Sequence, residues 1–359
     1  MKGGRKLLDL RPLEWMVALL LPAACLTPVD IEVDNKKFGE LIAISGQIST
    51  QEERSFVEVG IAVESNTKPL PVSEAKVIVS DQYANVIEFI EDPLFPGKYV
   101  YGGTGATGGQ YQLEVTLPDG RMFRSAAETL QPPAAPDVVS QEFKLVDIVD
   151  YEGAFVSEAR IEISTKPDLT GPRRPLLKWY VEETYLIRPT NFPDPFGLEP
   201  PDCFVRQGAD PQRVVLFDGR EYSGAFPEPL LLATRKVDQS FFYRHYFTVY
   251  QSSLTPEAFD YWKKVNILTS QTGSIFDVPP ARITGNISQA GKPNVKAFGF
   301  FQAVGENLSR FYVLQTDLPD YGFLPAYCDY DPYRFSDYPP ECLDCLSARN
   351  STLRRPWWF

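Results

Sequence analysis

The sequence has little of several residue types on which catalysis often depends. Its 359 residues include one histidine, His245, five cysteines and three methionines. A zinc site built on two histidines would need a second imidazole, and a Ser-His-Asp relay has a single candidate base. Basic residues are outnumbered, because 35 Lys and Arg stand against 47 Asp and Glu, for a formal charge of −12. This acidic balance argues against nucleic acid as a partner.

Long hydrophobic runs are also missing near the N-terminus. The apolar run Trp15 to Leu21 is about seven residues, far short of the roughly 20 that span a bilayer. It follows four basic residues and precedes the small residues Ala23 and Ala24, the usual order in a secretory signal. We therefore expect residues 1–24 to be a lipoprotein signal peptide.

The segment Ala23-Ala24-Cys25 resembles the bacterial lipobox, in which a signal peptidase cuts before a cysteine that then carries acyl chains. Pro22 stands where the usual pattern has leucine, so ordinary cleavage with an unmodified Cys25 remains an alternative. We expect lipidation of Cys25 and attachment to the outer membrane through this anchor. Which face of that membrane the protein occupies stays undecided.

Alternating apolar and polar residues dominate the rest of the chain. Between residues 25 and 131 we expect about seven short strands, which predict an immunoglobulin-like or transthyretin-like β-sandwich. The turn Pro118-Asp119-Gly120 is a strong hairpin signal, whereas the glycines from Gly102 to Gly109 predict a loop. The Pro-rich stretch 132–139 predicts a linker between two domains.

Residues 140–346 predict a second, larger β-sandwich with long Pro-rich loops, followed by a tail over 347–359. The expected strands include 159–164, 177–185, 241–250, 297–303 and 310–314. One inserted helix is predicted near 255–269, because Thr255 can cap it and Pro256 suits its first position. The fold class is therefore mainly β, with two sandwiches.

Four cysteines remain after Cys25, and in an oxidising envelope they favour two structural disulfides. The candidates are Cys203, Cys328, Cys342 and Cys345, for which three connectivities are possible. A four-thiolate zinc site is the alternative, but only one C-x-x-C pair is present. We expect the disulfides to hold the loop 190–212 and the segment 328–345 on the second sandwich.

A possible binding surface lies near the C-terminus, where aromatic residues alternate with carboxylates. Exposed rings there could stack on a sugar or a partner, and the candidates are Tyr327, Tyr330, Tyr333 and Tyr338. The alternative is an acidic loop whose tyrosines cover the sandwich. His245 lies in an aromatic strand without a nucleophile motif, which favours a hydrogen-bonded structural histidine.

Several blocks of sequence together resemble a family of Bacteroidetes cell-envelope lipoproteins, the domain-of-unknown-function family 4249. The most specific block runs from Ile275 to Ile287, with sequence IFDVPPARITGNI. Others are the lipobox cysteine, Ser45 to Ile48, Pro71 to Val77, Leu117 to Gly120, Leu254 to Trp262 and the Cys-rich tail. The resemblance implies an outer-membrane lipoprotein, typically encoded beside a TonB-dependent receptor. It implies no known chemistry.

These observations favour a non-catalytic outer-membrane lipoprotein that is accessory to a TonB-dependent receptor in ligand capture or uptake. No cofactor, metal ligand set or catalytic residue is predicted. The alternatives are a carboxylate-dependent envelope hydrolase acting on glycans and a purely structural envelope protein. The hydrolase would require clustered acids with raised pKa values in a pocket, with Asp329 and Asp331 as a candidate pair.

Overall fold

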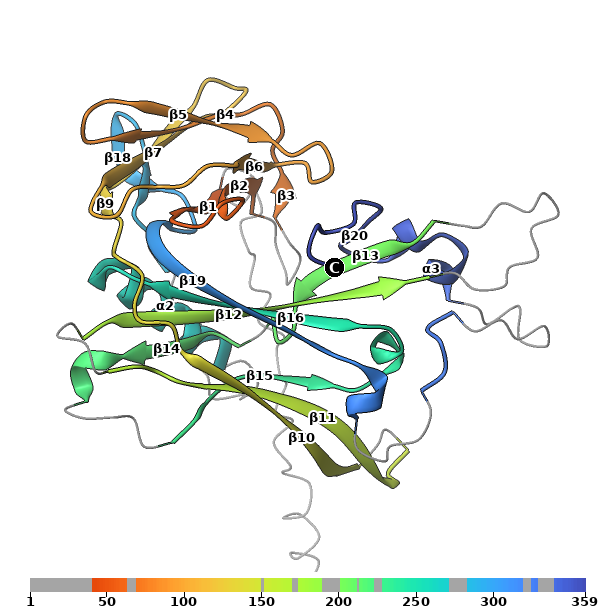
Figure 1. Cartoon of the computed structure of the whole chain (residues 1–359). Coiled ribbons are helices and arrows are strands. Elements are labelled where there is room, and N and C mark those ends of the chain that lie inside the picture. The colour runs from red at the N-terminus through yellow and green to blue at the C-terminus, as the bar shows by residue number, and fades with distance from the viewer. Residues whose placement is uncertain are drawn as a thin grey trace, which may run out of the picture. The chain divides into compact units, whose positions relative to one another are not determined.

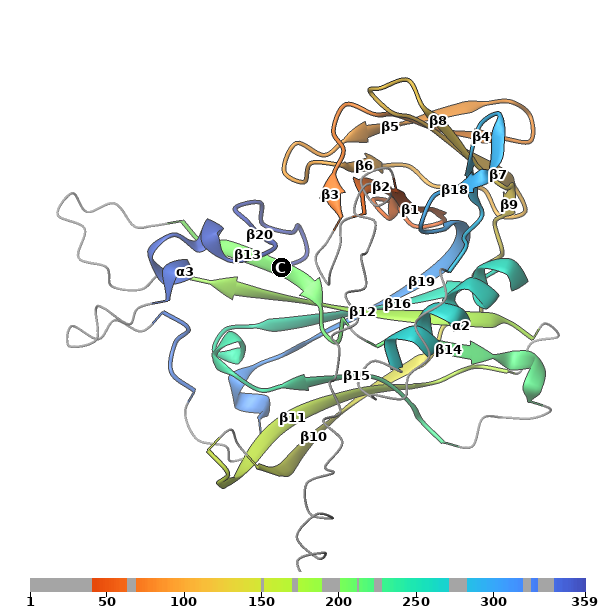
Figure 2. The ribbon, with the colours of Figure 1, turned by 180° about the vertical axis from the view of Figure 1, so that it is seen from behind.

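The computed structural model describes residues 41–62, 69–149, 152–169, 174–188, 201–211, 213–222, 228–270, 283–318, 324–328 and 339–359. All of them lie in the unit formed by residues 38–359. Most elements are strands, and two hydrophobic cores lie between pairs of sheets (Figures 1 and 2). The predicted fold class, mainly β with two sandwiches, is confirmed.

The first sandwich is built from short antiparallel strands near the N-terminal end of the described chain. Its strands are β1 (Ile42–Ser49), β2 (Ser55–Ile61), β3 (Leu70–Pro71), β4 (Lys76–Asp81), β5 (Val86–Glu91), β6 (Lys98–Tyr101), β7 (Gln110–Thr116), β8 (Met122–Ser125) and β9 (Glu128–Thr129). Alternate residues of β1 and β7 are buried, which is why these period-two segments form strands. The predicted turn before β8 is present, with Gly120 at φ +85°.

The second sandwich packs two sheets around a separate core. A three-stranded sheet contains β10 (Val138–Val149), β11 (Phe155–Lys166) and β15 (Leu230–Lys236). The facing sheet contains β12 (Leu176–Ile187), β13 (Cys203–Gly208), β14 (Val215–Asp218), β16 (His245–Ser253), β19 (Phe301–Val313) and β20 (Ser351–Thr352). Trp179, Phe247 and Ile161 are among the buried side chains between them.

One strand, β19, belongs to both sandwiches. Its first residues pair in parallel with β1, with Phe301 opposite Gly46 and Val304 opposite Ser49. From Gly305 onward it pairs antiparallel with β16. Since strand pairing fixes the positions of both partners, β19 connects the two sandwiches through continuous backbone hydrogen bonds.

The first core also draws on a part of the chain far from residues 25–131. Strands β17 (Ile287–Gln289) and β18 (Lys292–Lys296) form a hairpin, and β17 pairs with β8. Ile287, Ala297, Phe301 and Ala303 lie in the first core. A division into consecutive segments could not anticipate this, because strand pairing joins residues that are distant in sequence. The predicted domain boundaries themselves stay a prediction.

The Pro-rich stretch before β10 is bonded to the second sandwich. Ala134 donates its backbone N–H to Ser253 Oγ at 3.0 Å, and Asn307 donates to the Ala134 carbonyl at 2.7 Å. Trp179 donates its indole N–H to Asp137 at 2.9 Å. Strand β10 begins at Val138, inside the range 132–139 expected to be linker.

The predicted helix is α2 (Pro256–Ser270), one residue longer than expected at its C-terminal end. Ala258 donates its backbone N–H to Thr255 Oγ1 at 3.2 Å, as the cap prediction required. Ala258 and Phe259 are buried against Leu176 and Val304. The helix therefore covers one end of the sheet that contains β12. The short elements are α3 (Pro340–Leu343), η1 (Gly219–Glu221), η2 (Gln239–Phe241), η3 (Gln315–Asp317) and η5 (Cys345–Ser347).

Two predicted strands were placed too early in the chain. The segment 241–250 was expected to be one strand, but η2 ends at Phe241 and β16 starts at His245. Asp238 explains this difference, because its carboxylate accepts the Ser240 N–H at 2.9 Å and caps the turn. The strand expected over 297–303 begins only at Phe301, after Gly299 at φ +100°.

Candidate functional site

The sheet that faces β10, β11 and β15 has a second side, which we call the outer face. Side chains alternate along each strand, so those flanking the buried Trp179, Val181, Phe247 and Val249 point away from the second core. The outer face consists of Lys178, Tyr180, Glu182, Thr184, Phe204, Arg206, Tyr246, Thr248, Tyr250, Ser252, Glu306, Leu308, Arg310 and Tyr312. Aromatic and charged side chains dominate this set.

At the β1 end of the outer face, Glu306 is a buried carboxylate with several donors. Its side chain is 1% exposed and forms an ion pair with Arg54 at 3.1 Å. Ser49 and Ser252 donate to the same carboxylate at 2.7 and 3.0 Å. Burial alone would raise the pKa of Glu306, but the Arg54 charge and these hydrogen bonds lower it below its ordinary value. Glu306 is therefore a charged anchor where the two sandwiches meet.

Next to this anchor, aromatic rings stack with cations. The Arg54 guanidinium lies 3.7 Å from the centre of the Tyr250 ring, and Tyr250 in turn stacks on Tyr180 at 6.2 Å. The ring of Tyr180 is 41% exposed. Lys178 lies 3.8 Å from the centre of the Trp262 ring of α2, and burial lowers the pKa of this amine to about 7. Tyr180 thus offers an open aromatic surface on a rigid support.

The middle of the outer face carries a surplus of positive charge. Arg206 pairs with Glu182 at 2.8 Å, whereas no carboxylate in the described parts of the chain lies within ion-pairing distance of Arg310. Arg310 donates to Thr248 Oγ1 at 3.0 Å and lies 3.8 Å from the Trp358 ring centre. Burial lowers the pKa of Arg310 and the Arg206 charge acts in the same direction, whereas Tyr250 and the Glu182 charge act to raise it. Arg310 therefore shares the influence of the Glu182 carboxylate with Arg206 and forms no ion pair of its own among the described residues.

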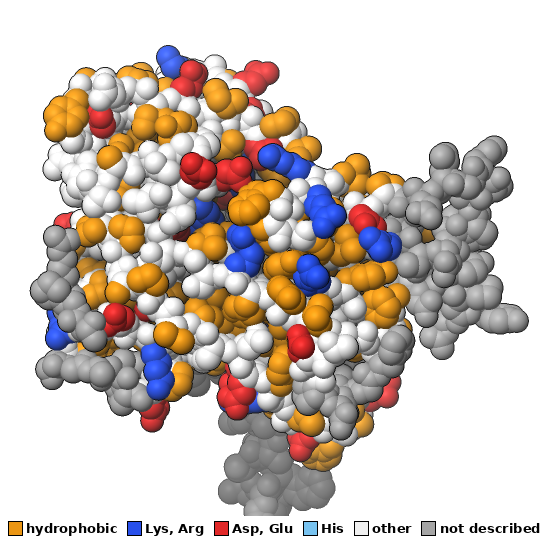
Figure 3. All heavy atoms as spheres, in the orientation of Figure 1, with side chains coloured by type: hydrophobic (Ala, Val, Ile, Leu, Met, Phe, Trp, Pro, Cys, Tyr) orange, Lys and Arg blue, Asp and Glu red, His pale blue; other side chains and the backbone are white. Residues whose placement is uncertain are grey.

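Cationic side chains form a group on the face that Figure 3 shows, with acidic side chains next to them. In Figure 3 the blue Lys and Arg side chains gather among orange hydrophobic ones in the middle of the view, over the region of β12, β13 and β16. Arg244 adds to this set, with its guanidinium 4.8 Å from the Tyr312 ring centre. A cationic patch on a chain of formal charge −12 indicates a local preference for anions.

A shallow hollow of about 350 Å³ adjoins the Tyr312 end of the outer face. It is lined by Leu186, Arg188, Phe242, Tyr243, Arg244, Leu314, Arg355 and Phe359. Arg188 is held by two hydrogen bonds to Asp202, at 2.8 and 2.6 Å, so its charge is already paired. The hollow extends the arginine- and aromatic-rich character of the outer face.

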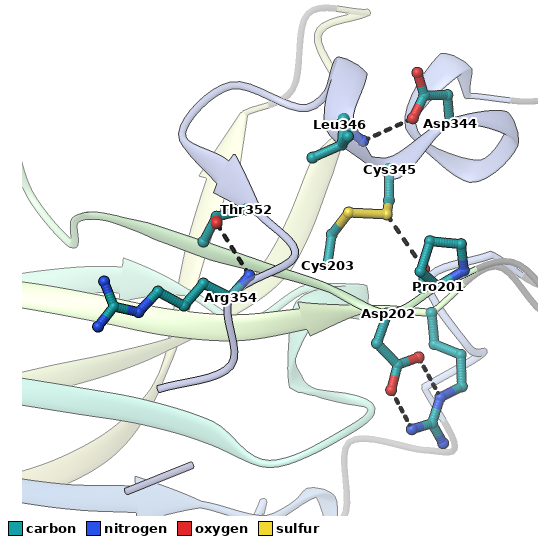
Figure 4. Close-up of a disulfide and its surroundings, with 9 residues drawn as sticks. Pro201, Asp202, Cys203, Asp344, Cys345, Leu346, Thr352 and Arg354 are labelled. Carbon is teal, nitrogen blue, oxygen red and sulfur yellow. Dashed lines mark hydrogen bonds and ion pairs between the residues drawn. A yellow bond between two sulfur atoms is a disulfide. The ribbon is translucent and has the colours of Figure 1, made fainter. Parts of the chain in front are cut away.

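Disulfides hold the C-terminal segment across this face. Cys203 of β13 bonds to Cys345, as Figure 4 shows, and Cys328 bonds to Cys342. Strand β20 then pairs with β13, with Thr352 opposite Phe204, and the chain continues to Trp358 beside Tyr246 at 5.1 Å. The prediction of two structural disulfides is confirmed, and the structure selects one of the three connectivities.

The only histidine lies on the opposite, buried side of the same sheet. His245 is 0% exposed, with Nε2 3.1 Å from Glu183 and Nδ1 3.3 Å from Ser240 Oγ. Arg235 donates to the same Glu183 carboxylate at 2.6 Å. Burial alone would raise the pKa of Glu183, but His245 and Arg235 lower it.

This group has the residue types of a Ser-His-Glu relay but lacks access for a substrate. The Ser240 hydroxyl donates to Asp238 at 2.6 Å, which is shorter than its approach to His245. Ser240, His245 and Glu183 are each at most 2% exposed. A nucleophile must reach a substrate carbonyl, so this network acts as a structural cross-link between strands.

Two carboxyl groups have raised pKa values, and each lies at a structural junction. Burial raises the pKa of Asp137 to about 6 and that of Glu128 to about 7. Glu128 accepts a hydrogen bond from Thr255 Oγ1 at 2.7 Å and one from Asn286 at 3.3 Å. The Glu257 charge adds to the raised pKa of Glu128, but neither Asp137 nor Glu128 lines the hollow described above, and a glycosidase mechanism requires two carboxyl groups that flank a cleft.

The raised pKa of Glu128 predicts a pH-dependent stability. The pKa of Glu128 is about 7 in the folded protein and near 4.5 in the unfolded chain, so the folded protein binds this proton more tightly. The stabilisation that proton binding gives to the folded state is therefore lost as the pH rises through about 7. Glu128→Gln should therefore become more stable than wild type between pH 5 and 8, by up to about 3 kcal/mol. Urea unfolding of both proteins across this range measures the difference. If the free energies of unfolding of the two proteins changed with pH in parallel, the raised pKa of Glu128 would be contradicted. The control is Glu52→Gln, at an exposed site.

The structure describes one of the four predicted surface tyrosines. Tyr327 is half-buried, donates to Glu341 at 3.1 Å and stacks on Tyr185 at 6.4 Å, beside the disulfides. Tyr330, Tyr333 and Tyr338 lie outside the described residues, as do Cys25, Asp329 and Asp331. Tyr327 therefore contributes to packing around the disulfide cluster.

Sequence reasoning missed the outer-face residues Arg54, Tyr180, Arg206, Arg310 and Trp358. The available signal was the alternation along β12, where Lys178, Tyr180 and Glu182 stand between the apolar Leu177, Trp179 and Val181. This alternation shows that one side of the strand is polar, but it does not show which strands lie beside it.

The described residues hold neither a metal-ligand cluster nor a membrane-spanning helix. No group of three or more His, Cys, Asp or Glu side chains is arranged to hold a metal ion among them. Among the helices that the structure describes, none is both long enough and apolar enough to cross a membrane.

The fold and the outer face define a β-sandwich protein with an open arginine- and tyrosine-rich surface. The sequence profile of the family described as Domain of unknown function (DUF4249) matches residues 26–310, and the chain belongs to this family. The match covers the strands of both sandwiches as far as Arg310 in β19, and leaves out β20. No curated protein matches the chain.

Proposed function

We propose that this protein is a non-catalytic ligand-capture protein, whose outer face binds the ligand. The observation that supports this most strongly is the outer face itself, where Tyr180 is 41% and Tyr312 is 45% exposed and the Arg244 guanidinium lies 4.8 Å from the Tyr312 ring centre. Large aromatic rings are normally buried against other elements, and exposed ones beside arginines are typical of binding surfaces. The outer face thus combines ring surfaces with cationic hydrogen-bond donors.

We further propose that Cys25 carries a lipid anchor in the outer membrane and that the protein is accessory to a TonB-dependent receptor. The basic N-terminal residues, the short apolar run and Cys25 support the anchor. The extensive β surface and the open outer face suit a protein that presents a ligand to a partner. The continuous pairing through β19 would hold the binding face in a fixed position relative to the first sandwich.

Co-purification from native outer membranes tests this role. The full-length protein, with a C-terminal tag, is isolated in mild detergent, and mass spectrometry identifies the partners and the Cys25 peptide. We expect an acylated Cys25 and a receptor in near-equal amount, both lost in Cys25→Ser. A wild-type protein that is unacylated and isolated without a receptor would contradict the anchor and the accessory role. Ligand capture itself is tested separately, with variants of the outer face.

A further inference from the structure

Arg310 is a cation of the outer face that forms no ion pair within the described part of the chain. The Arg54 guanidinium is paired with Glu306 and that of Arg206 with Glu182, whereas Arg310 contacts the Thr248 and Tyr250 hydroxyls and the Trp358 ring and interacts with the Glu182 charge only at longer range. Arg206 also approaches Trp358, with its guanidinium carbon 6.0 Å from the ring centre. Two cations thus flank one indole, and of these two only Arg206 forms an ion pair with the Glu182 carboxylate.

Like charges held together in a partly buried place favour an anion between them. The Arg206 charge acts on Arg310 and the Arg54 charge acts on Arg206, and the single Glu182 carboxylate acts on all three arginines. A carboxylate placed at this point would accept paired hydrogen bonds from a planar guanidinium, which is the arrangement that arginine recognises best. Because three arginines share the Glu182 and Glu306 carboxylates, this part of the outer face favours an anionic group on a ligand.

Aromatic rings on both sides of Arg310 define the shape of the ligand. Tyr180 on β12 and Tyr312 on β19 are separated by two strand spacings across the sheet and by four residues along the strands. At the usual strand dimensions their backbones are about 16 Å apart. Both tyrosines are substantially exposed, and Leu308, which lies on β19 four residues before Tyr312, is 38% exposed. Such rings pack against the apolar faces of flat or ring-shaped groups. A single small anion could not reach both tyrosines, whereas a short chain of sugar rings could.

Resting on the proposed capture function, we propose that the outer face binds an acidic oligosaccharide, with a carboxylate of the sugar on Arg310 and sugar rings on Tyr180 and Tyr312. Arg310 has the role of charge recognition and the tyrosines have the role of ring recognition. Since the recognition is ionic in part, affinity should fall as the salt concentration rises.

Calorimetric titration of the full chain with a panel of uronate-containing oligosaccharides tests the proposal. The panel includes trigalacturonate, its methyl ester as the neutral counterpart, and inorganic phosphate as the simple anion. We expect the acid to bind at least tenfold more tightly than the ester and than phosphate. Arg310→Gln should weaken binding of the acid tenfold or more, because a charge-assisted hydrogen bond is lost. Arg310→Lys should recover only part of this loss, since lysine lacks the planar fork.

The matched control is Arg121→Gln, which removes an exposed arginine paired with Asp119 in the β7–β8 turn. It should bind the acid as wild type does, and circular dichroism with thermal melting verifies that each variant is folded. Equal binding of acid and ester, or wild-type binding by Arg310→Gln, would overturn the proposal. So would a failure of every acidic member to bind.

A second variant separates this proposal from the capture function. If a neutral oligosaccharide binds and Tyr180→Ala abolishes that binding, the capture function is supported and the acidic ligand class is wrong. If phosphate binds as tightly as trigalacturonate and Tyr180→Ala has no effect, the site is a simple anion site and the saccharide proposal fails.

Discussion

Glu306→Ala is expected to lower the free energy of unfolding by about 3–5 kcal/mol at pH 7, the usual cost of removing one partner from a buried ion pair. Glu306 is 1% exposed, and its removal leaves the Arg54 guanidinium and the Ser49 and Ser252 hydroxyls without their acceptor. Because Glu306 lies on β19, which pairs with both β1 and β16, the loss should affect both sandwiches. Urea unfolding followed by circular dichroism measures the change.

The pH dependence of the same variant has a predicted sign. The pKa of Glu306 is lowered on folding, so its stabilising contribution is present above pH 4.5 and is lost as the pH falls through the folded value. The difference between wild type and Glu306→Ala should therefore shrink in acid. The control is Glu114→Ala, which breaks the surface pair with Arg124 and should cost less than about 1 kcal/mol. Equal costs for the two variants would contradict the role of Glu306 as a buried anchor.

Removal of the Cys203–Cys345 disulfide is expected to have an effect of similar size. The bond closes a loop with a sequence separation of 142 residues, and the double variant with serine at both positions should lose about 4–5 kcal/mol. It also frees the segment that carries Trp358 to the side of Arg310. We therefore expect weaker ligand binding in this variant as well as a lower unfolding free energy, measured by denaturation and by titration.

The second disulfide provides the matched comparison. Cys328 and Cys342 are separated by 14 residues, so the paired serine variant should lose about 3 kcal/mol and less than the first. Trp358 remains tied through Cys345 in this variant, and ligand binding should be retained. If both double variants lost the same stability and the same affinity, the loop argument and the positioning of Trp358 would both be wrong.

Local signals in the sequence predicted much of the fold. Alternation identified β1, β2, β4 and β7, and the turn at Asp119 and Gly120 identified the hairpin before β8. Thr255 and Pro256 located the start of α2 within one residue. In each case the information lies within a few neighbouring residues, where backbone preference and side-chain periodicity act directly.

Features that depend on distant partners could not be read in this way. The passage of β19 from the first sandwich to the second depends on pairing between Phe301 and Gly46, which are far apart in the sequence. The even number of cysteines predicted two bonds, but only the structure pairs Cys203 with Cys345. The start of β16 at His245 was missed because the Asp238 cap competes with strand formation.

The candidate site could not be predicted either, because its residues are distant in sequence. Tyr180, Arg206 and Arg310 come from three strands, and Arg54 and Trp358 come from opposite ends of the chain. Each is unremarkable in its own segment. The search for motifs favoured the tyrosines near Asp329 because they are close together in sequence, whereas the outer face becomes a cluster only when the strands pair.

The most direct test of the central claim is hydroxyl-radical footprinting of the wild-type protein, alone and saturated with the acidic oligosaccharide panel. We predict that Tyr180 and Tyr312 become protected when ligand is present. Tyr83 and Phe155, which are 77% and 85% exposed elsewhere on the chain, are internal controls and should react as before. Unchanged reactivity of Tyr180 and Tyr312, or protection at the control residues in their place, would contradict the assignment of ligand binding to the outer face.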